Sequence, residues 1–303
     1  IVASGSNRRI YISPIHSQAV IADDVTCELT ACKARESFLS ASTPTRAMIT
    51  GGVCSAYGLD TWGKLFTNRQ LNALSTFSEL VNEVRNKIET DAVSSGMRNN
   101  RIGIANGGVD AWAYGEAVSV YLAFTISKMA DRGSSICSWD SSREGLRNTF
   151  GRQAIPMAWD YAESNPFCNA SGCFDNMLDW VYKCILEFPA STQGETCQFD
   201  AQSDCGLREI MVSTDPPYYD NIGYADLSDF FYVWMRQSLK SIYPNLFRTM
   251  LVPKAEELVA TPYRFNGSVE KARDFFEEGM LQADLSICSG RHSSYHLLRL
   301  QTK

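Results

Sequence analysis

The pattern of apolar and polar positions predicts a helical first part of the chain. Apolar side chains recur on one face of a helix in four segments, at 67–92, 112–131, 144–163 and 174–187. Thr67 is the expected N-cap of the first helix. Pro156 requires a kink or a break in the third. Before them, residues 8–14 predict a short strand, and 15–66 predict loops and short elements.

The pattern changes after residue 187. Two short runs, 195–203 and 207–215, favour β-structure, and each carries an aspartate at or near its end. A strongly amphipathic helix is predicted at 226–244, with Asp226 or Ser228 as its cap. A strand, a turn with an acidic residue and then a helix are typical of an open α/β sheet. Ligands bind such sheets beyond the carboxyl ends of the strands.

The composition mainly excludes classes of protein. The 303 residues are 45% hydrophobic and 20% charged, which is ordinary for a globular protein. Because no run of about 18 apolar residues occurs, we expect no membrane-spanning segment. The net charge of −6 argues against a large DNA footprint but allows a local basic groove.

The cysteines bear on redox compartment and metal binding. The ten cysteines include no C-x-x-C pair, and the three histidines lie far from the closest cysteine pairs in sequence. Structural zinc sites usually show tighter paired spacing. We therefore predict no metal site, reduced thiols and a cytoplasmic location.

One short stretch suggests chemistry. Residues 213–224 read STDPPYYDNIGY, and a chance D-P-P-Y in a chain of this length is expected on the order of one time in a thousand. The motif at 215–218 follows an apolar run and precedes a helix. In this setting it resembles motif IV of the amino-group methyltransferases that use S-adenosylmethionine.

The residue types of the motif suit methyl transfer to adenine. The exocyclic amine is a poor nucleophile, because its lone pair is delocalised into the ring. Acceptors aimed at its N–H groups, the Asp215 carboxylate and the Pro216 carbonyl, draw the nitrogen towards a nucleophilic geometry. Pro217 completes a double proline that holds this carbonyl rigidly. Tyr218 offers a flat face for a base that has been flipped out of the duplex.

The resemblance extends beyond the motif. Five segments are similar to a family of large prokaryotic adenine-specific DNA methylases: 57–71, 121–139, 149–167, 213–240 and 251–279. The family implies a Rossmann-like methyltransferase fold, S-adenosylmethionine as donor and adenine N6 of DNA as acceptor.

The resemblance also implies roles for single residues. Asp200 would contact the adenine of the cofactor, and Asp215 would also border the cofactor. Tyr219, Asn221 and Tyr224 would line the pocket for the base or face the DNA. The polar residues Arg152, Asp160 and Glu163 are interpreted as solvated or structural.

We therefore expect an α/β fold, with part of a Rossmann-like methyltransferase sheet and a largely helical N-terminal region. Residues 1–100 would form an accessory region with the long helix, and 101–303 part of the catalytic domain. The family's glycine-rich cofactor loop, D-P-F-x-G-x-G, has no match here, so the remainder of a longer methylase chain is an expected partner. The resemblance stops after Met280, and a shifted reading frame is our hypothesis for 281–303.

Two alternatives remain open. A methylase of RNA adenine or of a protein amide also needs an acceptor pair and a stacking residue, although glutamine methylases usually carry Asn where this chain has Asp215. A non-catalytic scaffold is the other alternative, because a chain without the glycine loop could lack cofactor binding altogether.

Overall fold

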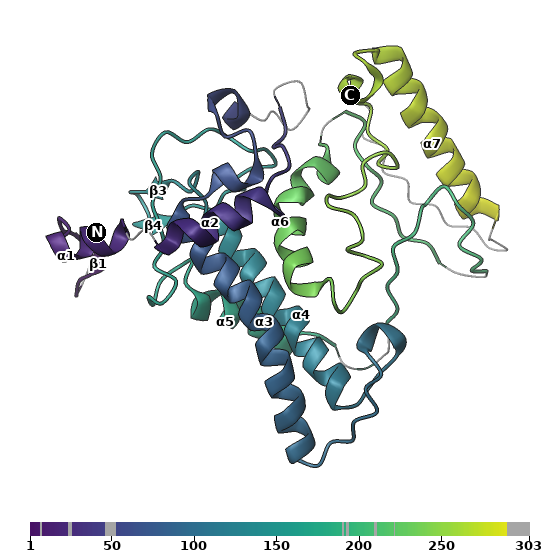
Figure 1. Cartoon of the computed structure of the whole chain (residues 1–303). Helices are drawn as coiled ribbons and strands as arrows, with labels where there is room; N and C mark the ends of the chain where they lie inside the picture. The colour runs from purple at the N-terminus through teal and green to yellow at the C-terminus, as the bar shows by residue number, and fades with distance from the viewer. Residues whose placement is uncertain are drawn as a thin grey trace.

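The chain is a mixed α/β structure in which helices predominate (Figure 1). The computed structural model describes residues 1–6, 8–23, 26–45, 53–189, 191, 194–208, 211–220 and 222–289. The α-helices are α1 (His16–Ala22), α2 (Thr26–Glu36), α3 (Asn68–Ser94), α4 (Ala111–Arg132), α5 (Phe174–Leu186), α6 (Tyr224–Leu239) and α7 (Val269–Ser289). Short 3-10 helices are η1 (Val53–Tyr57), η2 (Trp62–Leu65), η3 (Ile104–Asn106) and η4 (Pro262–Phe265). None of the helices in the described part of the chain is long and apolar enough to cross a membrane.

The helical core is built around α3, α4 and α6. Helices α3 and α4 lie side by side and run in opposite directions, and α6 packs against both (Figure 1). Helix α2 contacts α3, and α5 contacts α4. The predicted cap of α3 is confirmed, because the Thr67 hydroxyl accepts a hydrogen bond from the Gln70 amide and Gln70 Oε1 accepts one from the Thr67 amide. The helices predicted at 112–131 and 174–187 are confirmed as α4 and α5.

Aromatic rings form the centre of this core. Phe66 stacks on Phe230 at 5.6 Å between ring centroids, and Trp234 meets Phe66 edge-on at 5.5 Å. Trp62 meets Phe230 edge-on, and all four rings are buried. Each contributes about 1.5–3 kcal/mol by leaving water. Core residues come from both sides of residue 100, and the division into an accessory and a catalytic domain stays a prediction.

The helix predicted at 144–163 is wrong. The segment contains the two-residue strand β4 (Gly145–Leu146), which pairs with β3 (Trp139–Asp140), and continues as turns and loops. Pro156 removes a donor that a helix needs. The loop backbone instead bonds to the end of α4, since Asp131 accepts hydrogen bonds from the amides of Thr149 and Phe150. This loop carries Arg152 and Gln153 past the side of α6.

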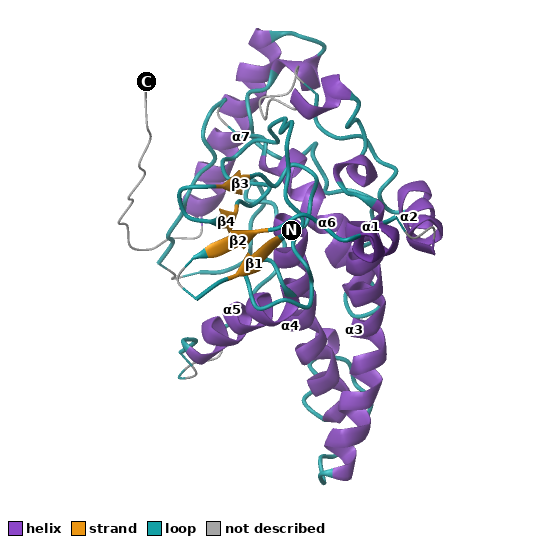
Figure 2. Cartoon of the chain, turned by 90° about the vertical axis from the view of Figure 1, so that its left-hand side faces the viewer, coloured by secondary structure: helices purple, strands orange, loops and turns teal. Residues whose placement is uncertain are grey.

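The strands of the described residues form two small antiparallel sheets (Figure 2). Residues 8–14 contain the predicted strand as β2 (Arg9–Tyr11), which pairs with β1 (Val2–Ser4). The predicted strands at 195–203 and 207–215 are wrong for the residues that the structure describes, which form no β-ladder and include a turn at 201–203. A strand is stable only beside a neighbour that satisfies its backbone groups. The described residues therefore show an α/β mixture without the Rossmann-like sheet, which stays a prediction.

Candidate functional site

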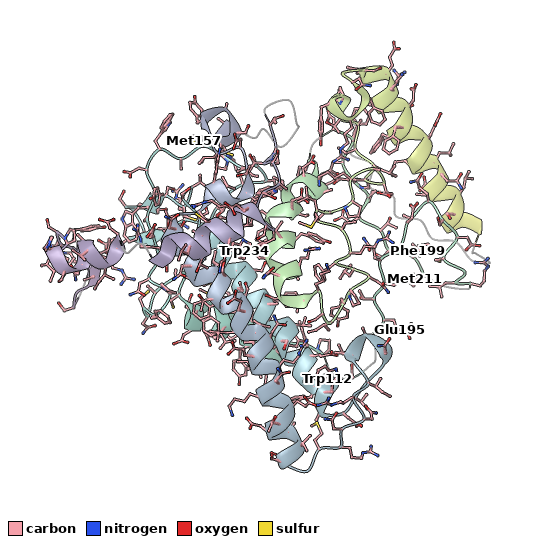
Figure 3. All side chains as sticks on the ribbon, in the orientation of Figure 1. Trp112, Met157, Glu195, Phe199, Met211 and Trp234 are labelled. Atoms are coloured by element: carbon pink, nitrogen blue, oxygen red, sulfur yellow. The ribbon has the colours of Figure 1, made fainter. Side chains whose placement is uncertain are left out.

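The D-P-P-Y motif lies in an extended, open segment. The side chains of Asp215 and Pro217 are exposed, and Pro216 is half-buried. Tyr218 is 46% exposed, which leaves room for a stacking partner. Figure 3 shows Met211, at the start of the same segment, on the side of α6 away from α3. The carboxylate and the ring are thus accessible to a ligand.

Tyr219 attaches the motif to the rest of the structure. Its carbonyl accepts a hydrogen bond from the Ala260 amide at 2.7 Å. Its ring meets Phe276 of α7 edge-on, with centroids 5.1 Å apart. The residue that follows the motif is therefore held by a backbone contact and a ring contact. Both contacts come from residues more than 40 positions further along the chain, which a local sequence pattern does not reveal.

The turn that carries Asp200 rests on the same helix. Asp200 closes it by accepting hydrogen bonds from the amides of Gln202 and Ser203, both at 2.9 Å. A Cβ at Gly279 of α7 would lie 3.3 Å from Gln202 Oε1 and 2.3 Å from Leu258 Cδ2, so a larger residue here would require the Leu258 side chain to shift. Phe276 and Gly279 are three residues apart and share a face of α7. The structure thus brings the Asp200 turn and the motif against one helix.

Helix α6 begins beside the motif with a cap from a distant residue. Its N-cap is Gly223, and the predicted caps Asp226 and Ser228 lie inside the first turns instead. Glu257 Oε1 accepts a hydrogen bond from the Ala225 amide at 2.9 Å, which satisfies a free donor at the helix start. A carboxylate there is also stabilised by the helix dipole.

A buried charged cluster fastens this helix start. Asp226 is buried and accepts hydrogen bonds from the Tyr263 hydroxyl and from Arg264, the latter at 3.2 Å. Arg264 also binds Glu257 at 2.7 Å and the Lys254 carbonyl at 2.9 Å. Burial, together with the hydrogen bond to Asp226, raises the pKa of Tyr263 to about 12. The guanidinium thus joins α6 to the segment that holds Tyr219.

A second ion pair extends the cluster. Asp229 accepts hydrogen bonds from Lys254 Nζ at 2.7 Å and from the Val252 amide at 2.8 Å. Burial raises the pKa of Asp229, and the ammonium of Lys254 opposes that shift without overcoming it. A cavity of about 560 Å³ is lined by Ser42, Pro44, Asp226, Asp229, Leu251, Lys254, Ala255, Tyr263 and Arg264. Because the charged side chains that line this cavity pair with one another, we interpret the cluster as a structural anchor for the start of α6.

The remaining candidates are dispersed. Tyr224 starts α6 and borders a different cavity, lined in part by Arg152 and Gln153. Asn221 lies outside the described residues. Glu163 pairs with Arg69 at 2.9 Å, consistent with a structural role. Among the residues that the structure describes, no three His, Cys, Asp or Glu side chains are grouped to hold a metal ion.

Sequence reasoning missed the residues that support the motif. Tyr263 and Arg264 carry no helical or strand pattern, and nothing in their neighbours points to Asp226. Helix α7 did have a signal, because apolar residues recur at helical spacing in 272–283 and face inward. Comparisons with protein-family models, with curated proteins and with solved structures found no match for the chain. The motif and its geometry therefore carry the functional argument.

Proposed function

We propose that the chain carries the acceptor side of an S-adenosylmethionine-dependent DNA adenine N6-methyltransferase. The observation that supports this most is the open D-P-P-Y segment, whose carboxylate and ring are exposed while its following residue is fastened to α7. A site that binds a flipped base needs both properties. The acceptor groups must be accessible, and they must be held so that little reorganisation is needed.

In this proposal each motif residue has a separate role in binding the adenine. The Asp215 carboxylate accepts one N–H of the adenine amine, and the Pro216 carbonyl accepts the other. Pro217 restricts the backbone that aims this carbonyl. Tyr218 stacks on the base and replaces the neighbours that it loses on leaving the duplex. As a hydrogen-bond acceptor, Asp215 also draws positive charge away from the nitrogen when its bond to carbon forms.

The donor would be bound largely elsewhere. S-adenosylmethionine, when bound, supplies an electrophilic methyl group, and Asp200 is the residue here that would contact its adenine. Asp200 fits such a role only in part, because its own turn already uses one carboxylate oxygen. We therefore propose that the remainder of a longer methylase chain supplies the glycine-rich loop and the missing sheet strands.

The test is methyl transfer by the complete gene product. Labelled methyl groups should pass from S-adenosylmethionine to duplex DNA, and Asp215→Ala should lower the rate about 100- to 1,000-fold by removing one charge-stabilising acceptor. Asp220→Ala, which removes another exposed carboxylate five residues after Asp215, is the matched control and should retain activity.

Three outcomes would contradict the proposal. Undiminished transfer by Asp215→Ala would refute the role of the carboxylate. Transfer to RNA or to a protein amide in preference to DNA would move the chain to another methylase class. The absence of calorimetric heat on addition of S-adenosylmethionine to the complete gene product would favour a non-catalytic scaffold.

A further inference from the structure

A second cavity lies along the first two turns of α6, facing the loop at 149–154. Its volume is about 440 Å³, within the range of small-molecule sites. Its lining residues come from these two segments and are Phe150, Arg152, Gln153, Tyr224, Leu227, Ser228 and Phe231. The cavity begins at Tyr224, six residues after Tyr218 of the motif.

The helical wall of the cavity is mainly apolar and aromatic. Tyr224, Leu227, Ser228 and Phe231 share one face of α6, because they are spaced by three and four residues. Phe231 packs against Phe150 with centroids 5.2 Å apart, which fixes the floor. Tyr224 lies at the rim and is 47% exposed. A flat ring in this position is available for stacking.

The loop wall adds two polar side chains without internal partners. Arg152 and Gln153 are exposed, and neither side chain forms a hydrogen bond or an ion pair with another described residue. Their backbone is nevertheless fixed between Phe150, whose ring packs on Phe230, and Ile155, which is fully buried. The loop thus presents a guanidinium and a primary amide from a rigid base.

This set of groups suits a nucleotide. A base stacks on aromatic rings, a primary amide can form a pair of hydrogen bonds with a base edge, and a guanidinium binds phosphate. An apolar ligand would make no use of either polar group. An acidic peptide would use the guanidinium but not the exposed ring.

The distance between the cavity and the motif limits which nucleotide of the strand could bind in the cavity. Six residues span at most about 20 Å, so the cavity lies within that reach of Tyr218. Successive stacked bases of one strand are about 3.4 Å apart. We propose that the cavity binds an unstacked base a few nucleotides from the target adenine on the same strand, with Arg152 on its phosphate. This rests on the proposed function and adds a second nucleotide site to it.

Binding of a fluorescent single-stranded oligodeoxynucleotide to the chain, without cofactor, tests the proposal. Tyr224→Leu removes the flat ring and should weaken binding about tenfold or more without changing its salt dependence. Arg152→Ala should weaken binding and lower the slope of log affinity against log salt by about one. Tyr224→Phe keeps the ring and should bind like the unmodified chain.

Controls separate the cavity from general charge and folding effects. Arg248→Ala removes another exposed arginine, which lies beyond the other end of α6, and should leave affinity and salt slope unchanged. Circular dichroism should show the same thermal midpoint for all variants. A photoreactive base in the oligonucleotide should crosslink to Tyr224 or Phe231, as mapped by mass spectrometry.

Several results would overturn the inference. One is equal affinity of Tyr224→Leu and the unmodified chain for the oligonucleotide. Another is crosslinks confined to other surfaces, and a third is displacement of the oligonucleotide by an acidic peptide but not by mononucleotides. Failure of the proposed function looks different. In that case the cavity variants would still weaken oligonucleotide binding, while the complete gene product would transfer no methyl group to DNA. Conversely, methyl transfer that is unaffected by Tyr224→Leu and Arg152→Ala would refute the nucleotide-binding role of the cavity and leave the proposed function intact.

Discussion

The helical core and the extended segments at 194–208 and 211–220 satisfy their backbones in different ways. In α3, α4 and α6 the backbone bonds within each helix, and the rings of one face pack together. In the extended segments large apolar side chains face solvent, with Met211 at 96% exposure. Figure 3 shows Glu195, Phe199 and Met211 together at the side of the molecule away from Trp234.

The contrast teaches which part of the fold is self-sufficient. A helix completes its hydrogen bonds with residues of its own, so the core forms from this chain alone. An extended segment completes them with water, with side chains or with a neighbouring strand, and the described residues provide no strand for 194–208 or 211–218. The D-P-P-Y motif lies in the extended part. In place of a sheet, the described residues hold this part through α7 and the cluster around Arg264.

Hydrogen exchange gives the largest expected difference between the two regions. Amides of α4 should exchange only by global unfolding, at a cost of about 5–15 kcal/mol, whereas amides of 195–208 should exchange at nearly the rate of an unfolded peptide. Mass spectrometry of the exchanged chain after peptic digestion measures this directly. Similar protection in both regions would contradict the contrast.

A smaller effect is expected at the junction of the regions. Arg264→Met leaves two carboxylates without their cation and should lower the free energy of unfolding by about 3 kcal/mol. Arg208→Met breaks the exposed pair with Asp204 and should cost about 1 kcal/mol or less. The side chains of the two arginines are 13% and 52% exposed, so burial is the variable under test. Urea unfolding measures both, and equal losses would show that the cluster is not an anchor.

The smallest effect concerns pH. Folding favours the neutral form of Tyr263, because burial raises its pKa to about 12. Its contribution to stability is therefore complete below about pH 10, the usual tyrosine pKa, and is lost as pH rises towards the folded value. Urea midpoints across this interval should fall more steeply for the unmodified chain than for Tyr263→Phe. Parallel profiles would place Tyr263 outside the buried cluster.

The sequence predicted the elements whose signals are local. Thr67 and Gln70 form the capping box of α3, and the apolar periods of α4, α5 and α6 place these helices within a few residues of their ends. The helix at 144–163 failed because Asp131 satisfies the loop backbone from outside the segment. A periodic apolar pattern does not reveal such a competing partner.

The sequence predicted the residue types of the candidate site but not the contacts that hold it. The order Asp215 to Tyr218 is visible in sequence, but the contacts of Tyr219 with Ala260 and Phe276 join residues far apart in the chain. Arg152 shows the same limit from the other side. Its exposed side chain agrees with a solvated residue, and only the structure shows that it lines a cavity with an aromatic floor.

The cap of α6 has a consequence for how the protein is made. The motif leaves the ribosome before Glu257, whose carboxylate completes the helix beside it, and before Arg264, which locks that helix in place. During synthesis the motif residues are thus exposed before their supporting contacts exist, and those contacts form only when the later segment folds back. A nascent chain halted before Glu257 would contain the whole motif but none of the contacts from Glu257, Ala260, Arg264 and Phe276 that hold it.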